Sequence, residues 1–309
     1  MSLNAEQILS RVENLNTYRH GDRRAPHKPL LLLLALARLK SGENRIRFSE
    51  IEEQLRSLLH AYAPPVSARH QPELPYWHLQ SDELWRVEGA EFLERQRGGF
   101  PKISALRETS AGFPDDVAQT LQSEDGLVEQ IAQAVLEEHF PASMHEDIIA
   151  AVGLGAIADT WQVRESSIAL KKVRSRDPNF RKKVLRAYEH RCVVTGFRAA
   201  LGGSYFGCEA GHVQWHAFGG PDTVENGISM EPTIHKLFDA GAWTLTDDRR
   251  VLVSADYSGS ETAVVRLREH HGKPIRKPVA GEPLLGLDYI KWHRESKLGG
   301  VFRSPALAL

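Results

Sequence analysis

Cysteine is scarce in this sequence, since only Cys192 and Cys208 occur among its 309 residues. Two thiols cannot form the disulfide framework of a small secreted protein, and they cannot supply a four-cysteine zinc site within one chain. Their wide separation indicates buried, unreactive thiols rather than two ligands of a zinc knuckle. Such cysteine usage is typical of a reducing compartment, so we expect a cytoplasmic protein.

Long apolar segments are also missing. The most apolar run extends from Pro29 to Leu39 and is interrupted by Arg38. It is far shorter than the ~20 residues that a membrane-spanning helix needs, and the polar N-terminal stretch has no apolar signal core. We therefore expect a soluble protein without a membrane partner, in which this run is a buried helix with Pro29 in its first turn.

The sequence also has no large excess of positive or negative charge, because its formal net charge is -1. The charge is nevertheless unevenly placed, since residues 163–191 hold ten Lys and Arg against three acidic residues. Such a run fits either a solvated helical face with a linker or a surface that follows phosphates. The motif that comes after the run favours the second interpretation.

The length and the composition, 41% hydrophobic and 26% charged, are typical of two soluble domains. A Gly-rich stretch, "AVGLGAIADT", lies within residues 141–163 and indicates the boundary. We predict an N-terminal domain over residues 1–155, a basic linker over 156–175 and a C-terminal domain over 176–309.

Periodicity predicts a mostly helical N-terminal domain, with amphipathic helices over residues 4–15, 49–62 and 126–140. Ser49 and Glu52 predict a capping box at the start of the second helix. Two short aromatic runs around a polar turn, "PYWHLQSDELWRV", predict a small β hairpin. Near the C-terminus, "RVLVS" and "TAVVRLREH" predict strands and "LDYIKWHRES" predicts a helix.

Histidines and one asparagine gather in the stretch "CEAGHVQWHAFGGPDTVENGISMEPTIHKLFDAG", from Cys208 to Gly241. It predicts a strand that ends near His212, then a polar loop that contains Asn226. A short helix follows, with Pro232 in its first turn and Gly241 after its end.

On that helix, His235 and Asp239 are four positions apart and lie on one face. An imidazole and a carboxylate so placed can share one divalent ion. His212 can face that ion and take a proton from water while the ion stabilises charge on a phosphate. Asn226 can fix the angle of His212 through hydrogen bonds from its side chain to the loop backbone.

The stretch resembles the HNH, or ββα-metal, nuclease motif in His212, Asn226 and His235, in their spacings of 14 and 9 residues, and in the flanking "EAGHVQW", "ENGI" and "HKLFDAG". Including the upstream "RDPNFRKKVLRAYEHRCVVTGF", the resemblance covers residues 176–246. It implies an α+β protein with a C-terminal endonuclease domain. His212 would be the general base, Asn226 would orient it, and His235 and Asp239 would bind Mg²⁺ or Mn²⁺, with Zn²⁺, Co²⁺ or Ni²⁺ as alternatives. The basic run would then contact the DNA backbone through Lys171, Lys172, Arg174, Arg176, Arg181 and Lys182.

One position departs from the family pattern. Many HNH proteins place a metal-binding Asp or His immediately before the base, where this sequence has Gly211. A ligand is missing unless Glu209, a water molecule or the scissile phosphate replaces it. A DNA-binding regulator that keeps the HNH fold without cutting is therefore an alternative. His216 is close in the sequence and is a weaker candidate for DNA contact.

Two N-terminal stretches, "YRHGDRRAPHKPLLLLLALARL" and "ARHQPELPYWHLQSDELWRV", resemble the sulfur-binding domains of HNH restriction endonucleases. The resemblance covers most of residues 1–155, and the order of the domains is the same. It implies a modification-dependent restriction endonuclease that acts on double-stranded DNA carrying phosphorothioate, in which sulfur replaces a non-bridging phosphate oxygen. A domain that reads another mark, such as 5-methylcytosine, is an alternative. Cutting both strands requires two active sites or two visits, which makes a homodimer a reasonable expectation.

Sulfur is more weakly hydrated than oxygen, so an apolar concavity accepts it at a lower desolvation cost, while charged donors hold the phosphate. The resemblance assigns Pro75 and Leu74 to this pocket, with Leu74 standing where an aromatic residue is common. His27 and Lys28 are equally compatible with a role at the start of the apolar helix. In a strand, Leu74 and Tyr76 would face away from Pro75 and Trp77; Trp77 and Trp85 are expected in the core. The residues expected to contact DNA are Arg23, Arg24, His27, Lys28, Arg69, His70, Leu74, Pro75, Tyr76 and His78.

Overall fold

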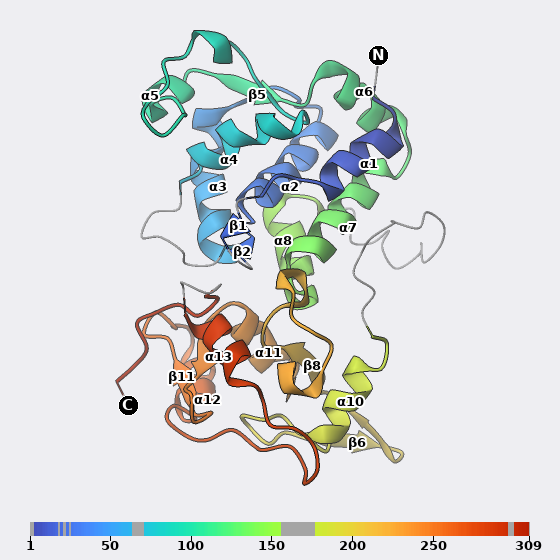
Figure 1. The fold of residues 1–309 in the computed structure, drawn as a ribbon, viewed down its shortest axis with the longest axis vertical. Coiled ribbons are helices and arrows are strands. Elements are labelled where there is room, and N and C mark those ends of the chain that lie inside the picture. The colour runs from blue at the N-terminus through green and yellow to red at the C-terminus, as the bar shows by residue number, and fades with distance from the viewer. Residues whose placement is uncertain are drawn as a thin grey trace. The chain divides into compact units, whose positions relative to one another are not determined.

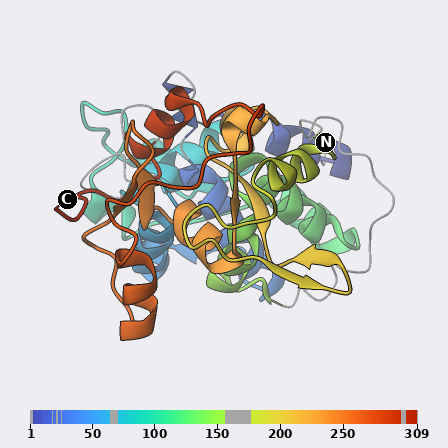
Figure 2. The same ribbon diagram turned by 90° about the horizontal axis from the view of Figure 1, so that it is seen from below.

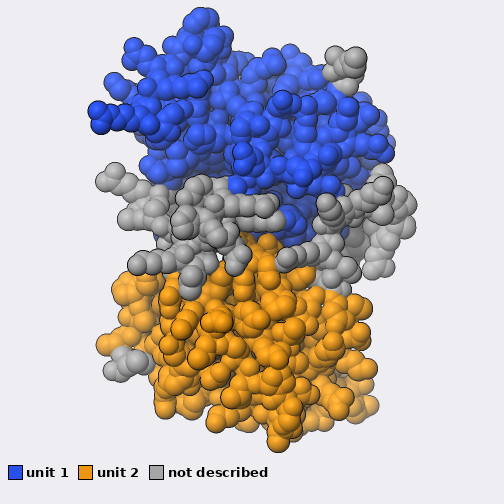
Figure 3. Space-filling view, in the orientation of Figure 1, with its two compact units in different colours: residues 1–19, 24–63, 67–173 blue, residues 20–23, 64–66, 174–309 orange. Residues whose placement is uncertain are grey.

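The computed structural model describes residues 3–17, 19–20, 23–24, 26–63, 71–155, 177–295 and 300–308. The chain divides into two compact units, which Figure 3 shows in blue and orange. The N-terminal unit comprises residues 1–19, 24–63 and 67–173, and the C-terminal unit comprises residues 20–23, 64–66 and 174–309. In the described part of the chain no helix is long and apolar enough to cross a membrane.

The N-terminal unit is mainly helical, and helix α2 lies at its centre (Figure 1). Every residue of α2 from Leu30 to Ala37 is buried, and the helix packs against α3, α4, α6, α7 and α8. A helix that is apolar on all sides belongs in a core, so the predicted buried helix is confirmed. The helices are α1 (Ala5–Glu13), α2 (His27–Lys40), α3 (Phe48–Tyr62), α4 (Glu73–His78), α5 (Ile103–Leu106), α6 (Asp115–Ser123), α7 (Leu127–His139) and α8 (His145–Val152).

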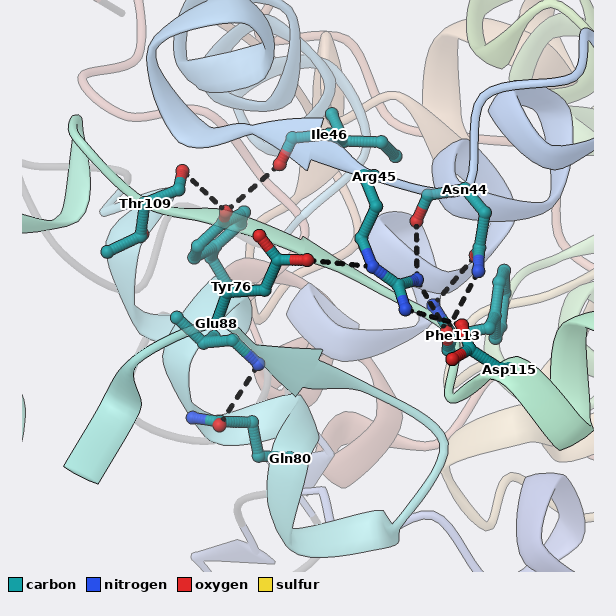
Figure 4. A network of polar contacts seen from close by, with 10 residues as sticks. Asn44, Arg45, Ile46, Tyr76, Gln80, Glu88, Thr109, Phe113 and Asp115 are labelled. Carbon is teal, nitrogen blue, oxygen red and sulfur yellow. Dashed lines mark hydrogen bonds and ion pairs between the residues drawn. The ribbon is translucent and has the colours of Figure 1, made fainter.

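The strands within the described part of residues 1–155 are very short: β1 (Arg19–His20), β2 (Arg23–Arg24), β3 (Ile46–Arg47), β4 (Arg86–Val87) and β5 (Ser110–Gly112). Three of them form one antiparallel sheet in the order β3-β5-β4. Figure 4 shows the polar network beside it, in which Arg45 contacts Glu88 and Asp115 and Tyr76 contacts the carbonyls of Ile46 and Thr109.

The predicted capping box at Ser49 is wrong. Helix α3 begins one residue earlier, at Phe48, and its capping residue Arg47 makes no side-chain cap. Phe48 is fully buried and its ring lies 4.8 Å from that of Tyr76, so burial of Phe48 decides where the helix begins. Glu52 is used elsewhere, in an ion pair with Arg107 at 2.7 Å.

The predicted hairpin over residues 75–87 is also wrong. Residues 73–78 form helix α4, and Leu79–Asp82 continue as a 3₁₀ turn. Pro75 stands in the first turn of α4, where its missing N–H costs no hydrogen bond. Strand β4 pairs with the distant β5 instead of a neighbouring strand. The strand alternation expected for Leu74 to Trp77 therefore does not apply, although Trp77 and Trp85 are buried as predicted.

The C-terminal unit consists of small antiparallel sheets and four helices among its described residues, which confirms the α+β class. Both cysteines are buried, as expected, and burial raises the pKa of the Cys208 thiol. The β6–β7 hairpin, yellow in Figure 2, projects from the unit with Leu201 79% exposed at its tip. The helices are α10 (Phe180–Ala187), α11 (Pro232–Asp239), α12 (Glu261–Arg268) and α13 (Leu287–Arg294), and the strands are β6 (Ala199–Leu201), β7 (Ser204–Phe206), β8 (Glu209–His212), β9 (Gly227–Met230), β10 (Trp243–Leu245) and β11 (Val251–Val253).

The predictions for this unit are mostly confirmed. The strand ending at His212, the helix beginning at Pro232 and the C-terminal helix are all present. Gly241 follows α11 with φ of 76°, a conformation that favours glycine. The strand expected within "TAVVRLREH" is wrong, because Glu261–Arg268 form helix α12, which Ser260 caps through the N–H of Ala263.

Candidate functional site

Strands β8 and β9 and helix α11 bring the three predicted residues of the motif together. In the antiparallel β8–β9 pair, His212 lies opposite Gly227 and Glu209 lies opposite Met230. Asn226 directly precedes β9, and His235 projects from α11, which packs against β8. One strand pair and one helix therefore position residues that are 23 positions apart in the sequence.

The His212 imidazole is held on one edge and on one face. Its Nε2 lies 2.7 Å from Oδ1 of Asp222. The ring of Phe180, at the start of α10, stacks on it at 3.9 Å with an interplanar angle of 11°. The His212 side chain is 15% exposed, so the ring lies at the surface of the unit without being freely hydrated.

Asn226 ties the two ends of the loop together. Its Oδ1 accepts a 2.8 Å hydrogen bond from the N–H of Gln214, and its Nδ2 donates to the carbonyls of Gln214 at 2.9 Å and Pro221 at 3.1 Å. Its own carbonyl accepts from the N–H of Val213 at 2.9 Å. Asn226 is fully buried. These bonds fix the backbone immediately after His212, as the sequence predicts.

His235 lies between two carboxylates. Its Nδ1 is 2.8 Å from Oε2 of Glu209, and its Nε2 is 3.2 Å from Oδ2 of Asp239. Burial lowers the pKa of His235, but the charge of Asp239 and the hydrogen bond with Glu209 raise it, and the net pKa is above its ordinary value. The hydrogen bond with His235 lowers the pKa of Glu209. Without a bound ion, these two contacts therefore favour the protonated form of His235.

Two side chains, those of His235 and Asp239, are placed so that they fit as ligands of one divalent ion. The 3.2 Å between Nε2 of His235 and Oδ2 of Asp239 is a separation that two ligands of one ion can adopt, each about 2.1 Å from it. Asp239 is buried, and its Oδ1 also accepts a 3.1 Å hydrogen bond from Nε1 of Trp215. Glu209 contacts the opposite ring nitrogen. Among the described residues, no group of three or more His, Cys, Asp or Glu side chains is arranged to hold an ion.

Gly211 has a steric reason for lacking a side chain. A Cβ at this position would lie 2.7 Å from Nε2 of His235 and 2.4 Å from Cε of Met230. The imidazole of His235 thus fills the space that a ligand preceding the base would need. Glu209, two residues earlier on the same face of β8, contacts His235 instead.

Other predicted residues of this unit lie around the site. His216 has its ring 5.8 Å from that of His212 and its Nε2 3.9 Å from Asp222. Arg181 and Lys182 are exposed on α10, and Arg181 donates a 3.1 Å hydrogen bond to the carbonyl of Cys208. Lys171, Lys172, Arg174 and Arg176 lie outside the described residues.

In the N-terminal unit, the predicted pocket residues lie on α4 and differ in exposure. Pro75 is buried, Leu74 is half-buried and His78 is exposed. Tyr76 is fully buried, and its hydroxyl donates to the carbonyls of Ile46 at 3.1 Å and Thr109 at 3.2 Å. Its ring packs the core of the unit rather than forming an apolar wall toward solvent.

The basic residues predicted to contact DNA also differ: some are buried or half-buried, and the side chains of others lie outside the described residues. Lys28 is buried, and its ammonium group lies 2.6 Å from Asp82 and 2.9 Å from the hydroxyl of Ser81. His27 is the half-buried first residue of α2, which supports the alternative in which His27 and Lys28 belong to the helix start. Arg23 and Arg24 form β2, but their side chains lie outside the described residues, as do Arg69 and His70.

Sequence reasoning missed Asp222, Phe180 and a loop beside α4. Asp222 sits in an irregular Gly/Pro loop where no periodicity singles it out, and Phe180 lies within the basic run, where the charged residues carry the signal. This loop, residues 94–102, contacts Trp77 of α4. Its Gly99 carbonyl accepts a 3.1 Å hydrogen bond from Trp77, and its Arg95 guanidinium lies over the Trp77 ring. The ring of Phe100 packs at 6.5 Å from that of His78. The basic composition of "ERQRGGFPK" was the available signal for this loop.

Two segments of the chain match models of known protein families. Residues 5–157 match the model of the ScoMcrA-like DNA sulfur-binding domain. Residues 192–246 match the model of an HNH endonuclease. These matches agree with the resemblances noted in the sequence. No curated protein matches the chain at a significant level.

Several solved structures are similar to about half of this chain. The sulfur-binding domain of ScoMcrA, complexed with phosphorothioated DNA, is 24% identical with a TM-score of 0.43, over 48% of this chain and 96% of that one. The sulfur-binding domain of SprMcrA, also complexed with phosphorothioated DNA, is 22% identical with a TM-score of 0.41, over 50% and 97%. The Type IV phosphorothioation-dependent restriction endonuclease ScoMcrA is 24% identical with a TM-score of 0.41, over 52% of this chain and only 35% of its own.

Proposed function

We propose that this chain, which joins a DNA sulfur-binding domain to an HNH endonuclease domain, is a modification-dependent restriction endonuclease. It binds double-stranded DNA that carries phosphorothioate and hydrolyses phosphodiester bonds nearby. The observation that carries the proposal is the assembly of His212, Asn226 and His235 on β8, β9 and α11, in a chain whose other half matches a sulfur-binding family.

In the nuclease domain, His212 takes a proton from the attacking water, and Asn226 holds the backbone that aims it. His235 and Asp239 would hold a divalent ion, Mg²⁺ or Mn²⁺ in the first instance. Such an ion would supply positive charge that stabilises the negative charge on the phosphate and on the leaving oxygen. Because His235 must lose its proton to become a ligand, ion binding competes with its charged contacts to Glu209 and Asp239.

In the reader domain, helix α4 supplies the surface that distinguishes sulfur from oxygen. Leu74 and Pro75 offer apolar atoms to the weakly hydrated sulfur, and the exposed His78 and the neighbouring loop of Arg95 to Pro101 offer polar and cationic groups to the phosphate. A normal phosphate oxygen loses its hydration on this surface without an equivalent partner, so it binds less tightly.

The basic run of residues 163–191 contacts the DNA backbone, and Arg181 and Lys182 are exposed on α10 within its described part. Cutting both strands requires two active sites or two binding events, so the active form on DNA is a homodimer or a pair of bound chains.

The proposal is tested with two duplexes of one sequence that differ only in a single Rp phosphorothioate. Binding is measured by gel shift with the full chain carrying His212→Ala, at two salt concentrations, and cleavage is measured with the unaltered chain and Mg²⁺ or Mn²⁺. We expect tenfold or greater preference for the sulfur duplex, about 1.4 kcal/mol, and metal-dependent cleavage that His212→Ala abolishes.

Three results would refute parts of the proposal. Equal binding that fades steeply with salt would mean that the N-terminal domain senses only phosphate charge. A preference for duplexes with 5-methylcytosine would identify another mark. Binding to the sulfur duplex without cleavage at any divalent ion would identify a DNA-binding regulator with an inactive HNH fold.

A further inference from the structure

Asp222 contacts the histidine that the proposed function makes the general base. Its Oδ1 lies 2.7 Å from Nε2 of His212, and the two side chains are 13% and 15% exposed. Its other oxygen, Oδ2, accepts a 2.6 Å hydrogen bond from the backbone N–H of Asp177. Both carboxylate oxygens thus have partners, so the group is fixed in orientation beside the ring.

The imidazole of His212 is restrained in two independent ways. The stacked ring of Phe180, at 3.9 Å, sets the plane of the imidazole. The bond to Asp222 sets its rotation within that plane. His216 adds a second histidine on the same side, with its Nε2 3.9 Å from Oδ2 of Asp222.

The loop that carries Asp222 is itself held by Asn226. The side chain of Asn226 donates to the carbonyl of Pro221 at 3.1 Å, and its backbone N–H donates to the carbonyl of Thr223 at 3.1 Å. These bonds hold the residues on both sides of Asp222. A Cβ at Gly220 would lie 1.8 Å from the carbonyl oxygen of Gln214, so the loop can close this tightly only with glycine there.

Asp222 is ionised in this environment. Burial raises its pKa, but the hydrogen bond from the Asp177 amide and the interaction with His212 lower it, and the net pKa is below its ordinary value. An ionised carboxylate can only accept hydrogen bonds, so the ring nitrogen that faces it must carry a hydrogen. The hydrogen of a neutral His212 therefore sits on Nε2, and the lone pair sits on Nδ1.

We propose that Asp222 is a positioning residue for hydrolysis, which fixes His212 in the tautomer that accepts a proton at Nδ1; this inference rests on the proposed nuclease function. The proton of the attacking water moves to Nδ1, and the water oxygen forms the new bond to phosphorus. The bond from phosphorus to the leaving sugar oxygen breaks, and that oxygen keeps the electron pair and is protonated from solvent. The imidazolium formed in this step lies against the negative charge of Asp222, which stabilises it.

The first test compares Asp222→Asn with Asp248→Asn in the full chain. Asp248 is an exposed carboxylate of the same domain that pairs with Arg250 and lies outside the site. An asparagine amide can donate to Nε2 and so favours the opposite tautomer. We expect Asp222→Asn to lower kcat on phosphorothioated duplex by about 100-fold or more, with unchanged Kd in the gel shift. We also expect Asp222→Glu to recover part of the rate, and Asp248→Asn to leave it unaltered.

The pH profile separates positioning from a structural role. Loss of the carboxylate makes His212 a weaker base, so the acidic limb of log kcat against pH should move to lower pH in Asp222→Asn. Cleavage by Asp222→Asn within twofold of the unaltered chain, with the same limb, would overturn the inference. If the unaltered chain cleaves nothing, the proposed function itself fails, which is a different result.

A second measurement needs no altered carboxylate and no cleavage. Long-range ¹⁵N–¹H spectra of the ¹⁵N-labelled full chain report which nitrogen of each neutral histidine is protonated, and His212→Ala identifies the signals of His212. We expect hydrogen on Nε2 and none on Nδ1. Hydrogen on Nδ1 would overturn the inference whether or not Asp222→Asn folds.

Discussion

The two units obtain their functional residues in different ways. In the C-terminal unit, one continuous stretch, residues 208–241, supplies the proposed base, its anchoring asparagine and the histidine on α11. In the N-terminal unit, residues proposed to meet DNA come from one short helix and from loops distant in the sequence, and three of the predicted residues, Lys28, Pro75 and Tyr76, are buried.

This difference has a physical origin. A strand–loop–strand–helix motif fixes the spacing of its side chains through local hydrogen bonds, so the spacing in the sequence carries the geometry. A recognition surface depends on which side of a helix faces the core, and packing decides that. The N-terminal unit can therefore be disrupted through its interior, whereas the C-terminal unit is most sensitive at the contact between β8 and α11.

The largest effect is expected from Lys28→Met. The ion pair of Lys28 with Asp82 is enclosed, with side chains 10% and 4% exposed, so the change leaves a buried carboxylate without its cation. We expect the N-terminal unit to lose about 3 kcal/mol of stability. Hydrogen exchange of the full chain in peptides from α2 and α4 measures this. Arg38→Met, on the same helix but in an exposed pair with Glu43, should cost less than about 1 kcal/mol; equal losses would mean that the Lys28 pair is not distinctive.

A comparable effect on chemistry, instead of stability, is expected from Gly211→Ala. The new Cβ would meet His235 at 2.7 Å and displace the ring from β8. We expect cleavage to fall by about 100-fold, or 2.7 kcal/mol, with sulfur-selective binding unchanged. Single-turnover cleavage checks the first point and gel shift the second. The control is Gly259→Ala, where the nearest atom to the new Cβ is 3.7 Å away. Full activity of Gly211→Ala would show that His235 need not stay against β8.

A smaller effect is expected from Tyr76→Phe, which removes the hydroxyl that bridges the carbonyls of Ile46 and Thr109 in the core. We expect a loss of about 1–2 kcal/mol in the N-terminal unit and an unchanged ratio of sulfur to oxygen binding, since the ring packs inside. Urea unfolding and the two-duplex gel shift measure these. Tyr62→Phe removes a solvent-exposed bond to Asp147 and serves as the control. A collapse of sulfur selectivity without loss of stability would show that Tyr76 acts at the pocket.

The smallest effect is expected on the stability of the C-terminal unit when the pH is lowered. Burial lowers the pKa of His293 from 6.5 to about 3. The Nε2–H of the neutral ring donates to the carbonyl of Phe238, and its Nδ1 accepts from the hydroxyl of Thr244. The folded unit keeps His293 neutral while the unfolded chain binds a proton below pH 6.5, so stability falls as the pH is lowered from there. Between pH 7 and 5.5 we expect His293 to account for a loss of about 1 kcal/mol.

Urea unfolding of the full chain at the two pH values measures this contribution. His293→Gln should reduce the loss by that amount, while His60→Gln, at an exposed position of the other unit, should leave it unchanged. The same pH dependence in all three chains would show that His293 does not contribute.

Much of the C-terminal site could be predicted because its signals are local. The spacing of His212, Asn226 and His235, with Pro232 and Gly241 at the ends of a helix, determined the strand, the loop and α11. The carboxylate of Asp222 could not be predicted, because it reaches His212 through an irregular loop with no periodic pattern. The steric role of Gly211 likewise depends on where α11 packs against β8.

By itself the sequence determined the α+β class, the buried apolar helix, and the strand and helix that carry His212 and His235, because local spacing and composition are properties of the chain alone. Only the tertiary structure decided that residues 73–78 form a helix, that Phe48 begins α3, and that Lys28 and Tyr76 lie inside. These outcomes depend on burial against partners distant in the sequence, such as Asp82 for Lys28 and Thr109 for Tyr76. Packing free energy then outweighs local preference.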